Sequence, residues 1–240
     1  MRELNIPNKL KEILDDFIQR FKKIYQEDLV SVILYGSAAS GEFIDRHSNL
    51  NILVVLKNTD LENLKKSSGL INKFRMVTPL FLTESYIAGS TDIFPIEFLD
   101  MQENYLVLCG KDVLKDIHID TRNLRFQCEQ ELKVKLLNLR QLYLRINKDK
   151  VALRNLLFKS FTSILHILRN VLRLKAKLPA YKKEDILKEL AAEFQIDMDI
   201  WGKILAAKVK QVKLNSKDTE QLFISFVREL EKVADIVDKL

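Results

Sequence analysis

Hydrophobic and polar positions follow two different rhythms in the first part of the chain. Apolar residues recur three or four positions apart after Pro7, which predicts an amphipathic helix. They are Leu10, Ile13, Phe17, Phe21 and Ile24. Two short apolar runs follow, over 29–35 and 50–56, and the first is stopped by Gly36. Their length and β-branched content predict two strands, the second of the buried kind.

The pattern continues with shorter elements as far as residue 110. It predicts a helix over 60–74, strands over 78–83 and 93–99, and a short apolar element over 105–108 that ends at Gly110. Pro79 and Pro95 lie inside the two strands. Because proline has no N–H to give to a sheet, these strands are the weakest of the predicted set.

The pattern then becomes helical throughout. It predicts long helices over 122–147 and 151–176, shorter ones over 183–194 and 198–211, and a last helix capped by Asn215 or Ser216. The apolar residues of the last helix alternate three and four apart and form a narrow seam. Such a seam fits packing inside a bundle or a contact between two copies of the chain.

Glycine and charge divide the chain at about the same place. Five of the six glycines precede residue 111. Residues 1–121 carry 14 Lys and Arg against 18 Asp and Glu, whereas residues 122–240 carry 25 against 15. We therefore expect an α+β chain of two domains: residues 1–118 with strands and turns, and residues 119–240 as an all-α helical bundle.

Composition excludes several classes of protein. Hydrophobic residues make up 47% of the 240 positions, which is too many for a disordered chain. The apolar runs are shorter than the roughly 20 residues of a membrane span, and the first residues have no apolar signal core. Two cysteines are too few for a disulfide framework. These features predict a cytoplasmic protein that does not cross a membrane.

Candidate chemistry is concentrated where the first strand ends and the second begins. Gly36 allows a ligand to approach the backbone, and the N–H groups of the turn, together with the Ser37 hydroxyl, can hold phosphate oxygens. Asn49 and Asn51 open the next strand. Because residues two apart on a strand share a face, both should project toward the Gly-Ser turn. Asn49 could equally be an ordinary turn residue.

A carboxylate between apolar neighbours, Glu97, lies on the predicted strand over 93–99. A carboxylate on such a strand needs a partner, because burying it alone is costly. It could be a metal ligand or a member of a structural ion pair.

The Gly36-Ser37 turn is followed by a gap of eleven residues and then by two polar residues that bracket one apolar residue. This pattern resembles the nucleotidyltransferase (DNA polymerase beta-like) superfamily. The resemblance implies a small mixed sheet with helices, often followed by a helical bundle. In active members the two strand positions are aspartates and a later strand gives a third carboxylate, which bind Mg²⁺ for transfer from a nucleoside triphosphate. Glu97 is the natural match to the third position, with Asn49 and Asn51 at the other two.

Two neutral residues at the aspartate positions should weaken Mg²⁺ binding, since magnesium sites depend on carboxylate charge. We therefore expect a nucleotide or phosphorylated small molecule to bind at Gly36 and Ser37, with weak or absent catalysis, as in a pseudoenzyme. The alternative is a non-enzymatic scaffold or regulator that acts through the bundle or its basic face. The aromatic residues of the second half lie at apolar helical positions, so nucleic acid is a less favoured partner.

Overall fold

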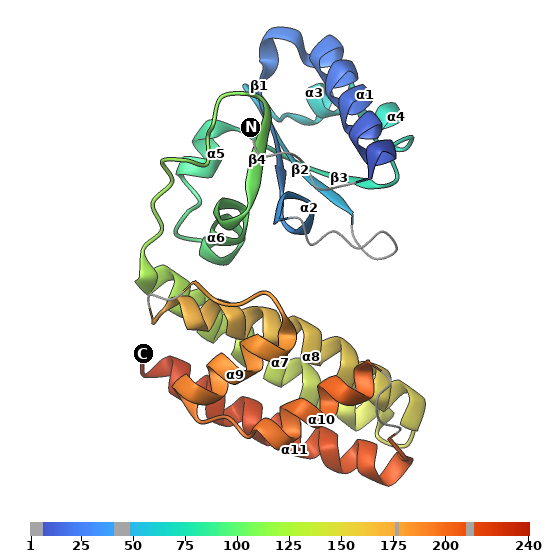
Figure 1. Ribbon diagram of the computed structural model, residues 1–240, viewed down its shortest axis with the longest axis vertical. Helices are drawn as coiled ribbons and strands as arrows, with labels where there is room; N and C mark the ends of the chain where they lie inside the picture. The colour runs from blue at the N-terminus through green and yellow to red at the C-terminus, as the bar shows by residue number, and fades with distance from the viewer. Residues whose placement is uncertain (1–6, 41–48, 176–177, 210–213) are drawn as a thin grey trace. The chain divides into compact units, whose positions relative to one another are not determined.

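A computed structural model describes residues 7–40, 49–175, 178–209 and 214–240. The chain divides into two compact units, Met1–Ile119 and Asp120–Leu240, which we call the α/β unit and the helical unit (Figure 1). The elements of the α/β unit are α1 (Asn8–Tyr25), η1 (Gln26–Asp28), β1 (Leu29–Tyr35), α2 (Ser37–Ser40), β2 (Leu50–Leu56), α3 (Leu61–Lys65), α4 (Ser68–Ile71), β3 (Val77–Leu82), α5 (Glu84–Ala88), α6 (Pro95–Glu103) and β4 (Tyr105–Gly110).

The four strands form one mixed sheet in the order β3-β2-β1-β4. Strand β1 is antiparallel to both of its neighbours, and β2 is parallel to β3. The two central strands match the predicted ranges, and β3 begins one residue early. Pro79 is tolerated in β3 because that strand lies at the edge of the sheet.

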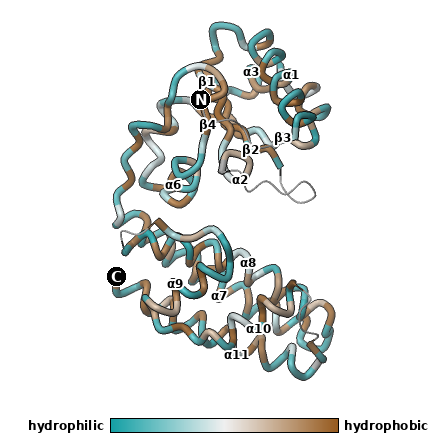
Figure 2. Tube along the Cα trace, in the orientation of Figure 1, coloured by the Kyte–Doolittle hydropathy of each residue, from teal (hydrophilic) through white to brown (hydrophobic). Residues whose placement is uncertain are grey.

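Each face of the sheet is covered by helices, and each face has its own core. Strand residues Val32, Leu34, Leu50, Ile52 and Val54 pack with α1 on one face. Ile33, Leu53 and Val55 pack on the other face with residues of α5, of α6 and of the segment after β4. Figure 2 shows the strands as the most hydrophobic part of this unit.

The predicted strand over 93–99 is wrong, because these residues belong mainly to helix α6. Pro95 occupies the first helical turn, where its fixed φ and missing N–H cost nothing. Phe98 and Met101, three residues apart, are the buried side chains that face the sheet. The predicted helix over 60–74 is also interrupted, since it forms two short helices, α3 and α4.

The helical unit contains five helices among its described residues. They are α7 (Thr121–Ile146), α8 (Lys150–Arg173), α9 (Lys183–Phe194), α10 (Met198–Lys208) and α11 (Ser216–Asp238). Side chains of Asp120, Asp149, Asp197 and Asn215 accept backbone N–H bonds at the starts of four of them. The predicted helical bundle is therefore confirmed, with Asn215 as the cap of its last helix.

Aromatic rings fill the centre of the helical unit. The Trp201 ring centroid lies 5.9 Å from that of Phe161 and 5.1 Å from that of Phe226, which belongs to α11. Phe226 is one of the seam residues, so the seam of α11 packs inside the bundle.

Helix α8 is the one described helix that is long and apolar enough to cross a membrane. Its apolar residues already have partners, because Leu157, Phe161, Ile164 and Leu168 are fully buried in the bundle. Packing among helices therefore accounts for the composition of α8.

Candidate functional site

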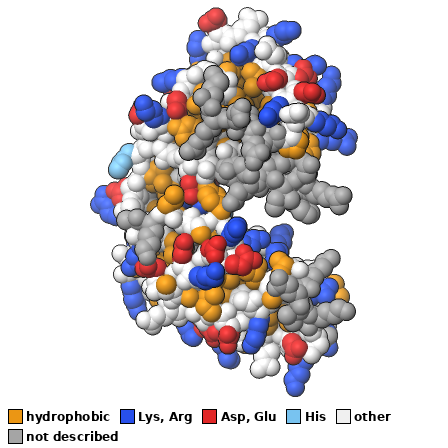
Figure 3. Space-filling model, in the orientation of Figure 1, with side chains coloured by type: hydrophobic (Ala, Val, Ile, Leu, Met, Phe, Trp, Pro, Cys, Tyr) orange, Lys and Arg blue, Asp and Glu red, His pale blue; other side chains and the backbone are white. Residues whose placement is uncertain are grey.

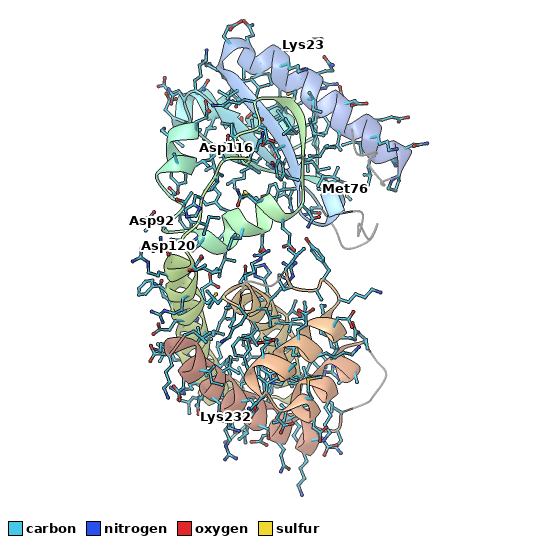
Figure 4. All side chains as sticks on the ribbon, turned by 60° about the vertical axis from the view of Figure 1, so that its left-hand side comes forward. Lys23, Met76, Asp92, Asp116, Asp120 and Lys232 are labelled. Atoms are coloured by element: carbon cyan, nitrogen blue, oxygen red, sulfur yellow. The ribbon has the colours of Figure 1, made fainter. Side chains whose placement is uncertain are left out.

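The site predicted from the sequence lies at one end of the mixed sheet, where four residues pair in a continuous row across the strands. Asn51 of β2 is paired with Tyr35 of β1 on one side and with Thr78 of β3 on the other. Tyr35 is paired in turn with Tyr105 of β4. Met76, labelled in Figure 4, immediately precedes β3 at this end of the sheet.

The two asparagines lie beside the third strand, as alternation along β2 allows. Asn51 is on the same face of the sheet as Leu53 and Val55, which pack with α5 and α6. Asn49 is exposed, and its Nδ2 donates a hydrogen bond to Thr78 Oγ1 at 3.2 Å. The parallel pairing of β2 with β3 thus brings two amides and one hydroxyl together.

The Gly36 turn lies against this group. Gly36 has φ +77°, a left-handed conformation that favours glycine, and a Cβ placed there would be 3.3 Å from Asn51 Nδ2. Its N–H donates to the Asn104 carbonyl oxygen at 3.0 Å, and its own carbonyl accepts from Ala39 N–H at 2.9 Å. The backbone of the turn is therefore held beside the amide of Asn51, as the sequence spacing predicts.

Ser37 is the first residue of the one-turn helix α2. Its backbone is described, but its side chain lies outside the described part of the structure, as do residues 41–48. The phosphate-holding role predicted for Gly36 and Ser37 stays a prediction.

Glu97 does not lie on a strand, contrary to the sequence interpretation. It is an exposed residue in the first turn of α6, where a carboxylate stabilises the positive end of the helix. The sheet position next to Asn51 on the third strand is held by Thr78 instead. Sequence reasoning missed Thr78 because the register of a parallel pair is set by the folded sheet.

Two tyrosines complete the row and are partly withdrawn from water. Burial raises the pKa of the Tyr35 hydroxyl. Burial also raises the pKa of Tyr105, and its hydroxyl donates a hydrogen bond to Asp112 Oδ2 at 3.1 Å, which raises the pKa further. Both hydroxyls therefore stay protonated at neutral pH and act as neutral groups.

The donor set of the row does not fit a pair of magnesium ions. Its side chains are amide, hydroxyl and phenol, whereas Mg²⁺ is held in proteins mainly by carboxylates and substrate phosphates. Among the residues that the structure describes, no group of three or more His, Cys, Asp or Glu side chains could hold a metal ion.

Comparison with known proteins identifies the fold. No family model matches the chain. A curated protein of Methanocaldococcus jannaschii, described as a candidate protein adenylyltransferase, is 43% identical over 49 residues, which are 20% of this chain and 33% of that protein. A spectinomycin adenyltransferase from an Enterococcus species, solved with ATP and spectinomycin, superposes with a TM-score of 0.59 at 12% identity, over 92% of this chain and 99% of the other.

The solved structure thus shares the fold over both units, although only 12% of the aligned residues are identical. The curated protein matches this chain over a short segment of high identity, and its description is also that of an adenylyltransferase. The chain is therefore a protein of the nucleotidyltransferase fold with a helical second unit, as the Gly-Ser turn and the strand after it predict.

Proposed function

We propose that the chain binds a nucleoside triphosphate or another phosphate-bearing ligand at the Gly36-Ser37 turn, with two-metal transfer weak or absent. The observation that supports this most directly is the neutral row beside the turn, in which the Asn51 amide lies next to the Gly36 backbone and Thr78 is paired with Asn51. The names of the two relatives make ATP the first nucleotide to test.

Charge is the reason to expect weak metal binding. Two unit charges about 4 Å apart attract with on the order of 4 kcal/mol at the effective dielectric typical of a protein surface. Because a dication carries two charges, replacing two carboxylates by amides removes up to four such pairwise attractions for each bound ion. A cation at Asn49 and Asn51 would keep only the weak ligation of amide oxygens.

Asparagine at these positions also supplies hydrogen-bond donors, which a carboxylate lacks. An asparagine side chain carries two N–H donors, and a carboxylate at neutral pH carries none. The Asn51 amide lies beside the Gly36 backbone, so it can donate directly to a phosphate oxygen held at the turn. Direct donation would replace part of the role that the metal has in active relatives.

The test is calorimetric titration of the whole chain with ATP, with and without Mg²⁺. We expect the wild-type affinity to be nearly independent of Mg²⁺. The double variant N49D/N51D should bind ATP more weakly without Mg²⁺ and regain affinity with it. The double variant N72D/N138D, which changes two exposed asparagines, is the control for net charge and should behave like the wild type.

Two results would count against the proposal. Mg²⁺-dependent binding in the wild type, lost in Glu97→Ala, would indicate that Glu97 completes a working metal site. The absence of binding of ATP, GTP, CTP or UTP under either condition would favour the alternative, a scaffold or regulator that acts through the basic helical unit.

A further inference from the structure

A groove lies wholly within the helical unit and is separate from the Gly36 turn. The lining comes from α7, α8 and the end of α10: Glu131, Lys135, Asn155, Phe158, Lys159, Thr162, Ser163, His166 and Lys208.

The groove in the helical unit has a volume of about 940 Å³. Ligand sites for small organic molecules commonly measure roughly 300–1,000 Å³, so the groove is large enough for one.

One face of α8 forms the floor of this groove. Asn155, Phe158, Thr162 and His166 lie three or four residues apart, which places them along one side of the helix. Phe158 is half-buried and supplies an apolar wall, whereas the other three are exposed polar side chains. The floor therefore offers both an apolar surface and hydrogen-bonding groups.

Lys208, in the last turn of α10, is fixed at the side of the groove. Its Nζ donates to the Phe158 carbonyl oxygen at 3.1 Å and lies 5.9 Å from the centre of the Phe158 ring. Burial lowers the pKa of Lys208, and the nearby charge of Lys183 lowers it further. An anion beside Lys208 would stabilise its charged form and so oppose both effects.

Positive charge exceeds negative charge in the lining. Lys135, Lys159 and Lys208 carry three positive charges, and Glu131 is the single carboxylate among the lining residues. The Gln127 amide donates to Glu131 Oε1 at 3.3 Å, so this carboxylate is already engaged within α7. Figure 3 shows Lys and Arg side chains distributed over the face in view. Three lysines line this one groove.

We propose that this groove binds a small organic phosphate, with its phosphate among Lys135, Lys159 and Lys208 and its apolar part against Phe158. With Glu131 counted, the three lysines leave a net charge of about +2 in the lining, which matches the charge of roughly −2 on a phosphate monoester. The half-buried ring favours an organic group over free phosphate. The site shares no residue with the Gly36 turn.

The test uses the imidazole of His166 as a local reporter in proton NMR of the whole chain, assigned with the variant His166→Gln. The probes are AMP and phenyl phosphate, with adenosine as the probe that lacks phosphate. We expect both phosphates to move the His166 signal saturably and adenosine to leave it unchanged. The triple variant K135Q/K159Q/K208Q should lose about tenfold or more in affinity.

A matched triple variant, K150Q/K203Q/K239Q, makes the same change in net charge outside the groove and should retain the wild-type affinity. The proposal is overturned if neither phosphate moves the His166 signal, or if the groove variant binds as the wild type does. Tighter binding of a single-stranded oligonucleotide, lost in the groove variant, would overturn it in favour of a nucleic-acid contact. Gly36→Ala should leave the His166 response intact, which separates this test from that of the proposed function.

Discussion

Gly110 ends β4 in a left-handed conformation, and its replacement by alanine should destabilise the α/β unit. Its φ is +83°, and a Cβ built there would lie 2.0 Å from the Val30 carbonyl oxygen and 2.9 Å from Ser31 Cα. Both neighbours are backbone atoms of β1, so they cannot turn aside as a side chain could. The end of β4 must therefore move away from β1.

The magnitude follows from two contributions. A non-glycine residue in the left-handed region costs about 1–2 kcal/mol. The Val30 carbonyl also accepts a hydrogen bond from Lys111 N–H at 3.1 Å, and losing a backbone hydrogen bond costs about 1 kcal/mol. We expect Gly110→Ala to lower the free energy of unfolding by about 2–3 kcal/mol, a large part of the 5–15 kcal/mol typical of a domain.

Denaturant unfolding followed by circular dichroism measures this change, and amide exchange of β1 and β4 locates it. Gly202→Ala is the control, because Gly202 lies inside α10 and a Cβ there meets nothing within 4 Å. That change should stabilise the helix by up to about 1 kcal/mol. A Gly110→Ala variant as stable as the wild type would refute the reasoning about the β1–β4 contact.

Three further predictions concern the helical unit. Phe161→Ala should cost about 3–5 kcal/mol, because it removes a fully buried ring, and fluorescence of Trp201 should report the loss on denaturation. Asp149→Ala should cost about 1 kcal/mol in the same assay, since the Asp149 side chain accepts two backbone N–H bonds at the start of α8; Asp149→Asn should retain most of the stability. The hydrogen bond from Lys133 lowers the pKa of Glu129, so its stabilising contribution is present above the ordinary carboxyl pKa and is lost as the pH falls through the lowered value. Unfolding midpoints of the wild type and Glu129→Gln should therefore differ at neutral pH and converge in acid.

Periodicity predicted those elements whose packing follows directly from the local pattern. The strands over 29–35 and 50–56 are buried on both faces, so their apolar runs are unambiguous. The segment that became α6 alternates at Ile96, Glu97 and Phe98 as a strand would, but Pro95 at its start favours a helix. Helix α5 was missed because it has only five residues, although Thr83 caps it.

The candidate site was predicted in part for a similar reason. The proximity of Asn51 to Gly36 follows from sequence, because Gly36 comes directly after the first predicted strand and Asn51 lies at the start of the second. The place of Thr78 beside Asn51 depends on the parallel pairing of β2 with β3, which local sequence does not encode. The assignment of the third polar position therefore required the folded sheet.

The burial of α8 has a consequence for the order in which the helical unit can be completed during synthesis. Helix α8 packs against α7, which precedes it, and against α11, which is made more than forty residues later. Until α11 is made, part of the apolar surface of α8 stays exposed, and such transient surfaces promote aggregation. Completion of this core therefore waits for the synthesis of Phe226 and the residues that follow it.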